Sequence, residues 1–189
     1  SNGGRRWEMP AVAPVEHPPA GLPFHPHAGL PLDPYLLGVL LGDGGLSVRG
    51  RVIVTTEHEL AATLPAYLPF PARMSLHSQA GESGKAGNYY IGGPTGRGAN
   101  PVIEAVRDLG LEGHTAHTKF IPDAYLYAPA LVRLSLLQGI MDTAGSVGRN
   151  GSNVEITVAS RRLAEGIQAL VWSLGGRARL REKRTKWKH

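Results

Sequence analysis

Residues 136–147 read LLQGIMDTAGSV and residues 36–46 read LLGVLLGDGGL, so the chain carries two similar apolar stretches. Each has the composition of a buried helix that ends at small residues and a glycine, a common helix stop. Superposing the two stretches puts Gly38 on Gly139 and Asp43 on Ala144. The same helix ending therefore occurs twice, with a carboxylate in the first copy and a methyl group in the second.

The elements that follow these two helices recur in the same order. Hydrophobic periodicity and turn residues after the helix at 34–43 predict a hairpin at 47–57, a helix at 57–68, strands at 72–79 and 87–93, and a helix at 100–110. After the helix at 130–143 they predict a hairpin at 145–160, a helix at 160–176 and a strand from 177. We therefore predict an α+β fold of two pseudo-two-fold related halves, each helix-strand-strand-helix-strand-strand, with antiparallel sheets.

The expected domain organisation follows from this repeat. Residues 1–31 are rich in proline and predict an extended connector, and residues 32–189 form the folded domain. Within the domain we place the first half at 32–112 and the second half at 113–189, which lacks its final strand and is C-terminally incomplete.

Composition narrows the classes of function. Twenty Lys and Arg against fifteen Asp and Glu give a formal charge of +5, which favours a polyanionic partner without establishing one. The chain has no cysteine, which excludes disulfides and thiolate chemistry and suits a reducing compartment. No apolar run reaches the length of a membrane span. We therefore expect a cytoplasmic protein without a membrane partner.

The glycines inside the two helices suggest that the helices pack together. Glycine in a helix interior costs about 1 kcal/mol relative to alanine, and close approach of a second helix at Gly38 and Gly139 would offset that cost. Glycines merely tolerated in buried helices are the alternative.

Side-by-side helices would bring two partially negative C-terminal ends together, where Asp43 is unfavourable unless a divalent cation binds. Asp43 in an ordinary Asp-Gly turn is the alternative for that residue.

The segments LLGVLLGDG (36–44) and LQGIMDTAG (137–145) resemble the two signature copies of the LAGLIDADG homing endonucleases of the intein-nested type. The segments PLDPYLLGVLLGDG, HTKFIPDAYL and SRRLAEGIQALVWSLGGRARLREKRT fit the same subgroup, so the resemblance covers most of residues 31–185. In that family, the last acid of each copy binds the divalent metals, Mg²⁺ or Mn²⁺, that serve phosphodiester hydrolysis. The resemblance thus implies a metal ligand at Asp43 and a lost ligand at Ala144.

The resemblance also implies roles for two lysines. Lys119, in TKFIP, matches a lysine that the family places near the active site, where it would polarise water or stabilise phosphate. Lys183 is the corresponding candidate in the second half, and a solvated surface charge is the alternative for each lysine. Asp142 lies two residues before Ala144, roughly 200° around the helix, and is a poor substitute ligand.

The predicted strands alternate as a DNA-binding surface should, although a half-solvated sheet would alternate in the same way. In the family architecture, two such sheets form a saddle along double-stranded DNA, bound by a monomer with internal pseudo-symmetry. The predicted DNA contacts are Arg49, Arg51, Thr55, Arg73, Ser75, His77, Gln79, Arg149, Asn153, Thr157, Arg177, Arg179 and Arg181. The sequence thus favours a site-specific DNA endonuclease impaired by Ala144, and a non-cleaving DNA-binding module or relic on the same fold is the alternative.

Overall fold

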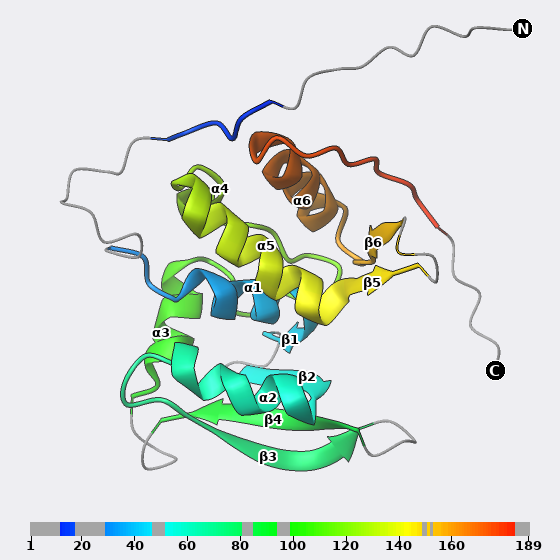
Figure 1. Cartoon of the computed structure of the whole chain (residues 1–189). Coiled ribbons are helices and arrows are strands. Elements are labelled where there is room, and N and C mark those ends of the chain that lie inside the picture. The colour runs from blue at the N-terminus through cyan, green and yellow to red at the C-terminus, as the bar shows by residue number, and fades with distance from the viewer. Residues whose placement is uncertain are drawn as a thin grey trace, which may run out of the picture.

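The computed structural model describes residues 12–17, 29–46, 52–80, 85–93, 99–148, 151 and 153–183. The fold is α+β, with helices packed above antiparallel strands (Figure 1), as the sequence predicts. The elements of the first half are α1 (Pro34–Asp43), β1 (Gly44–Gly45), β2 (Val52–Glu57), α2 (His58–Thr63), the 3-10 helix η1 (Leu64–Tyr67), β3 (Arg73–Ala80), β4 (Ala86–Gly92) and α3 (Pro101–Asp108). Those that follow are α4 (Asp123–Leu126), α5 (Ala130–Ala144), β5 (Gly145–Val147), β6 (Val154–Ile156) and α6 (Arg161–Ser173).

Side-chain caps fix where three of the helices begin. The carboxylate of Asp33 accepts the backbone N–H groups of the first residues of α1, and proline stands at the first helical position. Asn100 accepts the N–H of Val102 at the start of α3, and Ser160 accepts the N–H of Leu163 in α6. The helices predicted at 34–43, 100–110 and 160–176 begin within one residue of these starts, whereas α4 lies between predicted elements and was not predicted.

The helices α1 and α5 lie side by side and form the centre of the core (Figure 1). A Cβ atom added at Gly38 would lie 2.2 Å from the carbonyl oxygen of Leu136, and one added at Gly139 would lie 2.1 Å from that of Tyr35. Both distances are far below contact, so only glycine permits this approach at either position. The two glycines thus play reciprocal parts, each accommodating the backbone of the other helix.

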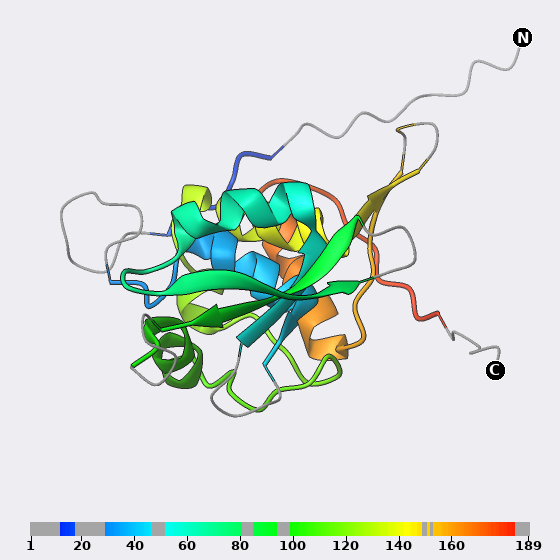
Figure 2. The ribbon, with the colours of Figure 1, turned by 90° about the horizontal axis from the view of Figure 1, so that it is seen from below.

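The first half carries a four-stranded antiparallel sheet in the order β1-β2-β4-β3. Val52, Val54 and Ile91 point to the helix side and are buried, which accounts for the alternation in these strands. In the view from below, the strands lie in front of α1, and no helix of the described residues covers the opposite face of the sheet (Figure 2). We call this surface the open face.

The strand predicted from residue 177 is wrong. Residues 176–183 have no strand assignment, and the described part of the second half has only the two-stranded sheet of β5 and β6. Side-chain alternation predicts a strand only where a neighbour can pair with the backbone, and no described strand pairs with this segment. The N–H of Gly176 donates to the carbonyl oxygen of Val171 at 2.9 Å, and Nε2 of Gln168 donates to the carbonyl oxygen of Ala178 at 3.2 Å.

Residues 12–17, within the stretch expected to be a connector, contact the second half. The N–H of Val15 donates to the carbonyl oxygen of Ser173 at 2.8 Å. The side chain of Arg133 is fully buried and donates to Ser173 Oγ, to the carbonyl oxygen of Val15 and, at 2.8 Å, to that of Ala128. This segment therefore bridges the start of α5 and the end of α6.

Candidate active site and nucleic-acid interface

The C-terminal ends of α1 and α5 meet. Asp43 is the last residue of α1 and Ala144 the last of α5, and extended glycines, Gly44 and Gly145, cap both helices. A Cβ atom added at Gly42 would lie 3.5 Å from the Cβ atom of Ala144. The structure thus brings the two signature ends together, with the carboxylate on one side only.

The environment of Asp43 raises the pKa of its carboxyl group. Asp43 is exposed, yet the protein around it raises the pKa of its carboxyl above the ordinary aspartate value through loss of hydration. The positive charge of Lys119 lowers this pKa, but its effect is the smaller of the two. A cation bound at this carboxylate would offset the lost hydration.

Lys119 lies at the same helix end, with only 3% of its surface exposed. Its Nζ donates to the carbonyl oxygens of Leu40 at 2.9 Å and Leu41 at 3.1 Å, so an ammonium caps the last turn of α1. Burial lowers the pKa of Lys119 to about 8, and the nearby charge of Asp43 acts in the opposite direction. The sequence pointed to Lys119 through its motif, but its contact with the α1 carbonyls required the fold.

Ser160 holds the backbone of Lys119 and was not among the predicted site residues. Its Oγ donates to the carbonyl oxygen of Lys119 at 2.6 Å while it accepts the N–H of Leu163 at 3.2 Å. Ser160 and Lys119 are both buried. The sequence predicted a helix from residue 160, but it did not show that the hydroxyl of Ser160 reaches a residue 41 positions away.

The described residues offer few further ligands for a metal ion near Asp43. They contain no group of three or more His, Asp, Glu or Cys side chains placed to hold an ion. Magnesium is commonly bound by one or two carboxylates together with water and substrate phosphate oxygens. The residues present therefore fit an ion that Asp43 would hold jointly with a phosphate group, and they do not fit an ion held by the protein alone.

Two other candidates lie away from this arrangement. Asp142 accepts a hydrogen bond from the hydroxyl of Tyr35 at 2.6 Å, so one of its oxygens is already engaged across the helix pair. Lys183 lies exposed at the end of the segment 176–183. Neither is described in contact with Asp43.

The open face carries polar side chains from three strands. Oγ1 of Thr55 donates to Oδ1 of Asn88 at 2.7 Å, and Nδ2 of Asn88 donates to Oγ of Ser78 at 3.0 Å. The ring of His77 lies against that of Tyr90, with centroids 4.2 Å apart. Asn88 and Tyr90 were not among the predicted contacts, although the two-residue alternation of β4 places both on its exposed face. Ser78 was not predicted because the register shift in β3 brings it opposite Asn88.

The predicted face of Gln79 is wrong, because β3 contains a bulge. The register shifts between Leu76 and Ser78, which places Ser78 opposite Asn88 and Gln79 opposite the buried Gly87. Oε1 of Gln79 therefore lies on the helix side, 3.0 Å from Nε2 of His58. Arg73 and Ser75 precede the bulge and keep the predicted face.

The remaining predicted DNA contacts are dispersed. Asn153 and Thr157 flank β6 and are exposed. Arg177, Arg179 and Arg181 are exposed too, on the segment without strand pairing. The predicted contacts Arg49, Arg51 and Arg149 lie outside the described residues.

Comparison with known proteins gives two matches. The Replicative DNA helicase DnaB of Mycobacterium intracellulare is 36% identical over 81 residues, which is 43% of this chain and 13% of that protein. The chain therefore spans only a small part of this relative. The family described as LAGLIDADG-like domain matches residues 132–189, which include most of α5 and all of β5, β6 and α6. Residues 132–189 of the chain are thus similar to LAGLIDADG-like domains.

Proposed function

We propose that the chain is the site-specific homing endonuclease domain of an intein, in which loss of a carboxylate at Ala144 impairs metal-dependent cleavage of double-stranded DNA. The observation that carries the proposal is the paired helix end. Gly38 and Gly139 allow α1 and α5 to meet, and their last residues, Asp43 and Ala144, occupy corresponding places. The reciprocal glycine contacts also support two halves related by a pseudo-two-fold axis.

The open face supports double-stranded DNA as the partner. It presents an arginine, hydroxyl groups, an amide and an aromatic pair from strands β2, β3 and β4. Such groups make phosphate and base-edge contacts in a groove. The exposed Arg177, Arg179 and Arg181 would add phosphate contacts from the second half.

Partial coverage of the helicase supports the intein context. A match that spans 13% of a protein is what a segment inserted in that protein would give. We therefore propose the helicase gene without its insertion as the DNA target, with cleavage in the cytoplasm by a monomer. In the described part of the chain, no helix is long and apolar enough to cross a membrane.

The divalent ion, Mg²⁺ or Mn²⁺, would activate water and stabilise the leaving oxygen when bound beside Asp43 and a DNA phosphate. The residues of the chain would hold the ion and fix the helix end that carries its ligand. Asp43 offers the carboxylate, and Lys119 fixes the last turn of α1 through two carbonyl oxygens. The methyl group of Ala144 offers no ligand from α5, which is the reason for expecting weak cleavage.

A second candidate is a DNA-binding module that does not cleave. Two observations favour it: the described residues hold no group of three or more acids, histidines or cysteines placed for a metal, and Lys119 is engaged with backbone carbonyls. A non-cleaving module would bind DNA through the same open face as an endonuclease, so only a cleavage assay distinguishes the two candidates.

Binding and cleavage of a duplex carrying the uninterrupted helicase site test the proposal. We expect the purified chain to bind this duplex more tightly than a scrambled duplex, with affinity that falls steeply as salt rises. We expect slow Mg²⁺-dependent cleavage that Asp43→Asn abolishes. Equal affinity for both duplexes would contradict site specificity, and efficient cleavage of both strands would contradict impairment by Ala144.

A further inference from the structure

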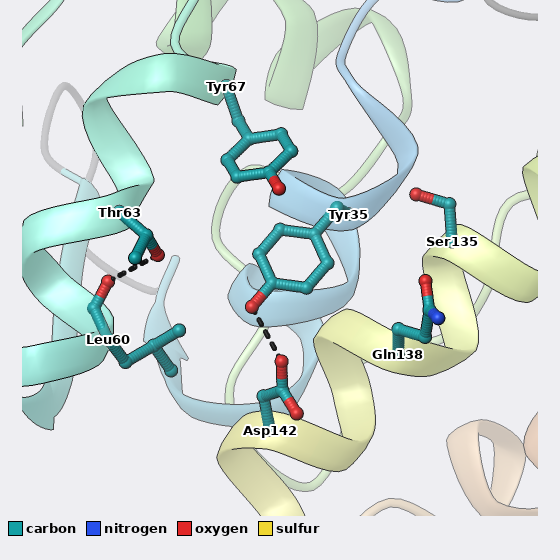
Figure 3. Close-up of a pocket in the computed structure, with 7 residues that line it drawn as sticks. All are labelled: Tyr35, Leu60, Thr63, Tyr67, Ser135, Gln138 and Asp142. Carbon is teal, nitrogen blue, oxygen red and sulfur yellow. Dashed lines mark hydrogen bonds between the residues drawn. The ribbon is translucent and has the colours of Figure 1, made fainter.

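A cavity of about 530 Å³ opens between α1, α2 with η1, and α5 (Figure 3). Its lining residues are Tyr35, Leu60, Thr63, Tyr67, Ser135, Gln138 and Asp142. None of them belongs to a strand, and none was assigned to DNA or metal binding. A ligand here would therefore not compete for the residues of the open face.

The charge of this cavity is opposite to that of the chain as a whole. Asp142 is the only ionisable acid or base in the lining apart from the tyrosines, whereas the chain has a formal charge of +5. One carboxylate oxygen of Asp142 accepts the hydroxyl of Tyr35 at 2.6 Å. The other accepts no hydrogen bond from the described residues, so it can accept one from a ligand.

Two aromatic rings form one side of the cavity. The rings of Tyr35 and Tyr67 have centroids 4.6 Å apart and planes inclined by 34°. Loss of hydration and the bond to Asp142 raise the pKa of Tyr35, so its hydroxyl stays protonated and continues to donate. Electron-rich ring faces attract a cation placed within about 6 Å of the ring centroid.

Polar groups lie on the α5 side. The hydroxyl of Ser135 and the amide of Gln138 make no hydrogen bonds with other described residues, and Figure 3 shows both beside the tyrosine rings. Each can accept a hydrogen bond from an N–H donor. The cavity volume also falls within the range of about 300–1,000 Å³ that is typical of small-ligand sites.

We propose that this cavity binds an organic cation, a guanidinium or alkylammonium group, between the tyrosine rings and the carboxylate of Asp142. The group would lie against the ring faces and donate hydrogen bonds to the free oxygen of Asp142 and to Ser135 and Gln138. A free small molecule and an arginine or lysine side chain of a polypeptide carry the same chemistry. The lining of the cavity includes none of the residues proposed to contact DNA or metal.

Titration of the full chain with N-acetyl-arginine methylamide, followed by NMR chemical shifts, tests the proposal. The citrulline analogue has the same shape without the charge and should bind at least tenfold more weakly. Asp142→Asn and Tyr67→Leu should each weaken binding of the arginine compound at least tenfold. Asp108→Asn, an exposed acid at the end of α3, makes the same chemical change outside the cavity and should leave affinity unchanged.

Thermal unfolding of each variant would show that the fold is kept, and Tyr67→Leu gives a second variant should Asp142→Asn fail to fold. Arginine-containing peptides of nine residues separate the two sources of the cation. Tenfold tighter binding of a peptide would support a polypeptide side chain, and equal binding would support a free small molecule. Equal affinity for the arginine and citrulline compounds, or no shift of the cavity residues with either compound or peptide, would overturn the proposal.

Discussion

Gly38 and Gly139 decide how closely α1 and α5 approach. A Cβ atom at either position would lie within 2.2 Å of a backbone oxygen of the other helix, and backbone cannot move aside cheaply. Overpacking of this kind costs about 1–3 kcal/mol or more. We therefore expect Gly38→Ala and Gly139→Ala each to lower the free energy of unfolding by at least about 2 kcal/mol, even though alanine favours a helix by about 1 kcal/mol.

Urea unfolding at neutral pH measures this effect. Gly92→Ala provides a matched control, because a Cβ atom added there meets nothing within 4 Å. A Gly38→Ala protein as stable as the control would show that the helices do not need this close contact.

Lys119 should give the chain a stability that rises at alkaline pH. Burial holds its pKa near 8 in the folded protein, against 10.5 for an ordinary lysine, so between these values the unfolded chain binds more protons. Stability then increases with pH across this window, by up to about 3 kcal/mol at about 1.4 kcal/mol per pKa unit. Below pH 8 the ammonium is charged in both states, and the cost of burying it is fully present.

Chemical unfolding between pH 7.5 and 10.5 tests this prediction against Lys119→Met. The two proteins share every other ionisable group, so the difference between the two stability curves isolates Lys119. Parallel curves would show that the ammonium loses no hydration in the fold.

At the scale of elements, the bulge in β3 separates two side chains that the sequence placed on one face. We expect His77→Ala to weaken DNA binding about fivefold, a loss of about 1 kcal/mol, because His77 lies on the open face with Tyr90. Gln79→Ala should leave DNA affinity unchanged and reduce stability by up to about 1 kcal/mol, because its partner is His58. Fluorescence anisotropy with duplex DNA measures the first effect, and thermal unfolding measures the second. Weaker DNA binding by Gln79→Ala together with unchanged DNA binding by His77→Ala would contradict the position of the bulge.

The sequence predicted those elements whose boundaries depend on residues close together in the chain. Caps at Asp33, Asn100 and Ser160 identify helix starts because a cap depends on residues two or three positions away. The bulge at His77 and the unpaired segment 176–183 depend on which backbone lies alongside, and side-chain alternation does not encode that. For the candidate site, the motif pointed to Asp43, Ala144 and Lys119, and their roles stay predictions. The hydrogen bond from Ser160 to the backbone of Lys119 depends on packing, which the motif does not encode.

At the scale of the whole molecule, residues 12–17 connect the beginning of the chain to its second half. Proline at position 15 would remove the N–H that donates to the carbonyl oxygen of Ser173. We expect Val15→Pro to lower the free energy of unfolding by about 1 kcal/mol and to change the environment of the Arg133 guanidinium, which the segment covers. Thermal unfolding and the side-chain NMR signal of Arg133 measure these effects.

Val12→Pro is the control for this prediction, because the described residues give the Val12 N–H no hydrogen bond. If Val15→Pro and Val12→Pro had equal and small effects, the segment would not be anchored through Val15.

The central claim is that the junction of α1 and α5 is a DNA-cleavage site that lacks one of its two acids. Cleavage of the uninterrupted helicase site by Ala144→Asp, compared with the chain that carries Ala144 at equal DNA affinity and in the presence of Mg²⁺, tests it most directly. A metal ligand contributes several kcal/mol to the transition state, so we expect the substitution to raise the rate about 100-fold or more. Without metal, the two carboxylates should repel, and Ala144→Asp should be no more stable than the chain that carries Ala144. Retained DNA binding with no gain in cleavage would contradict the account and favour a module that only binds DNA.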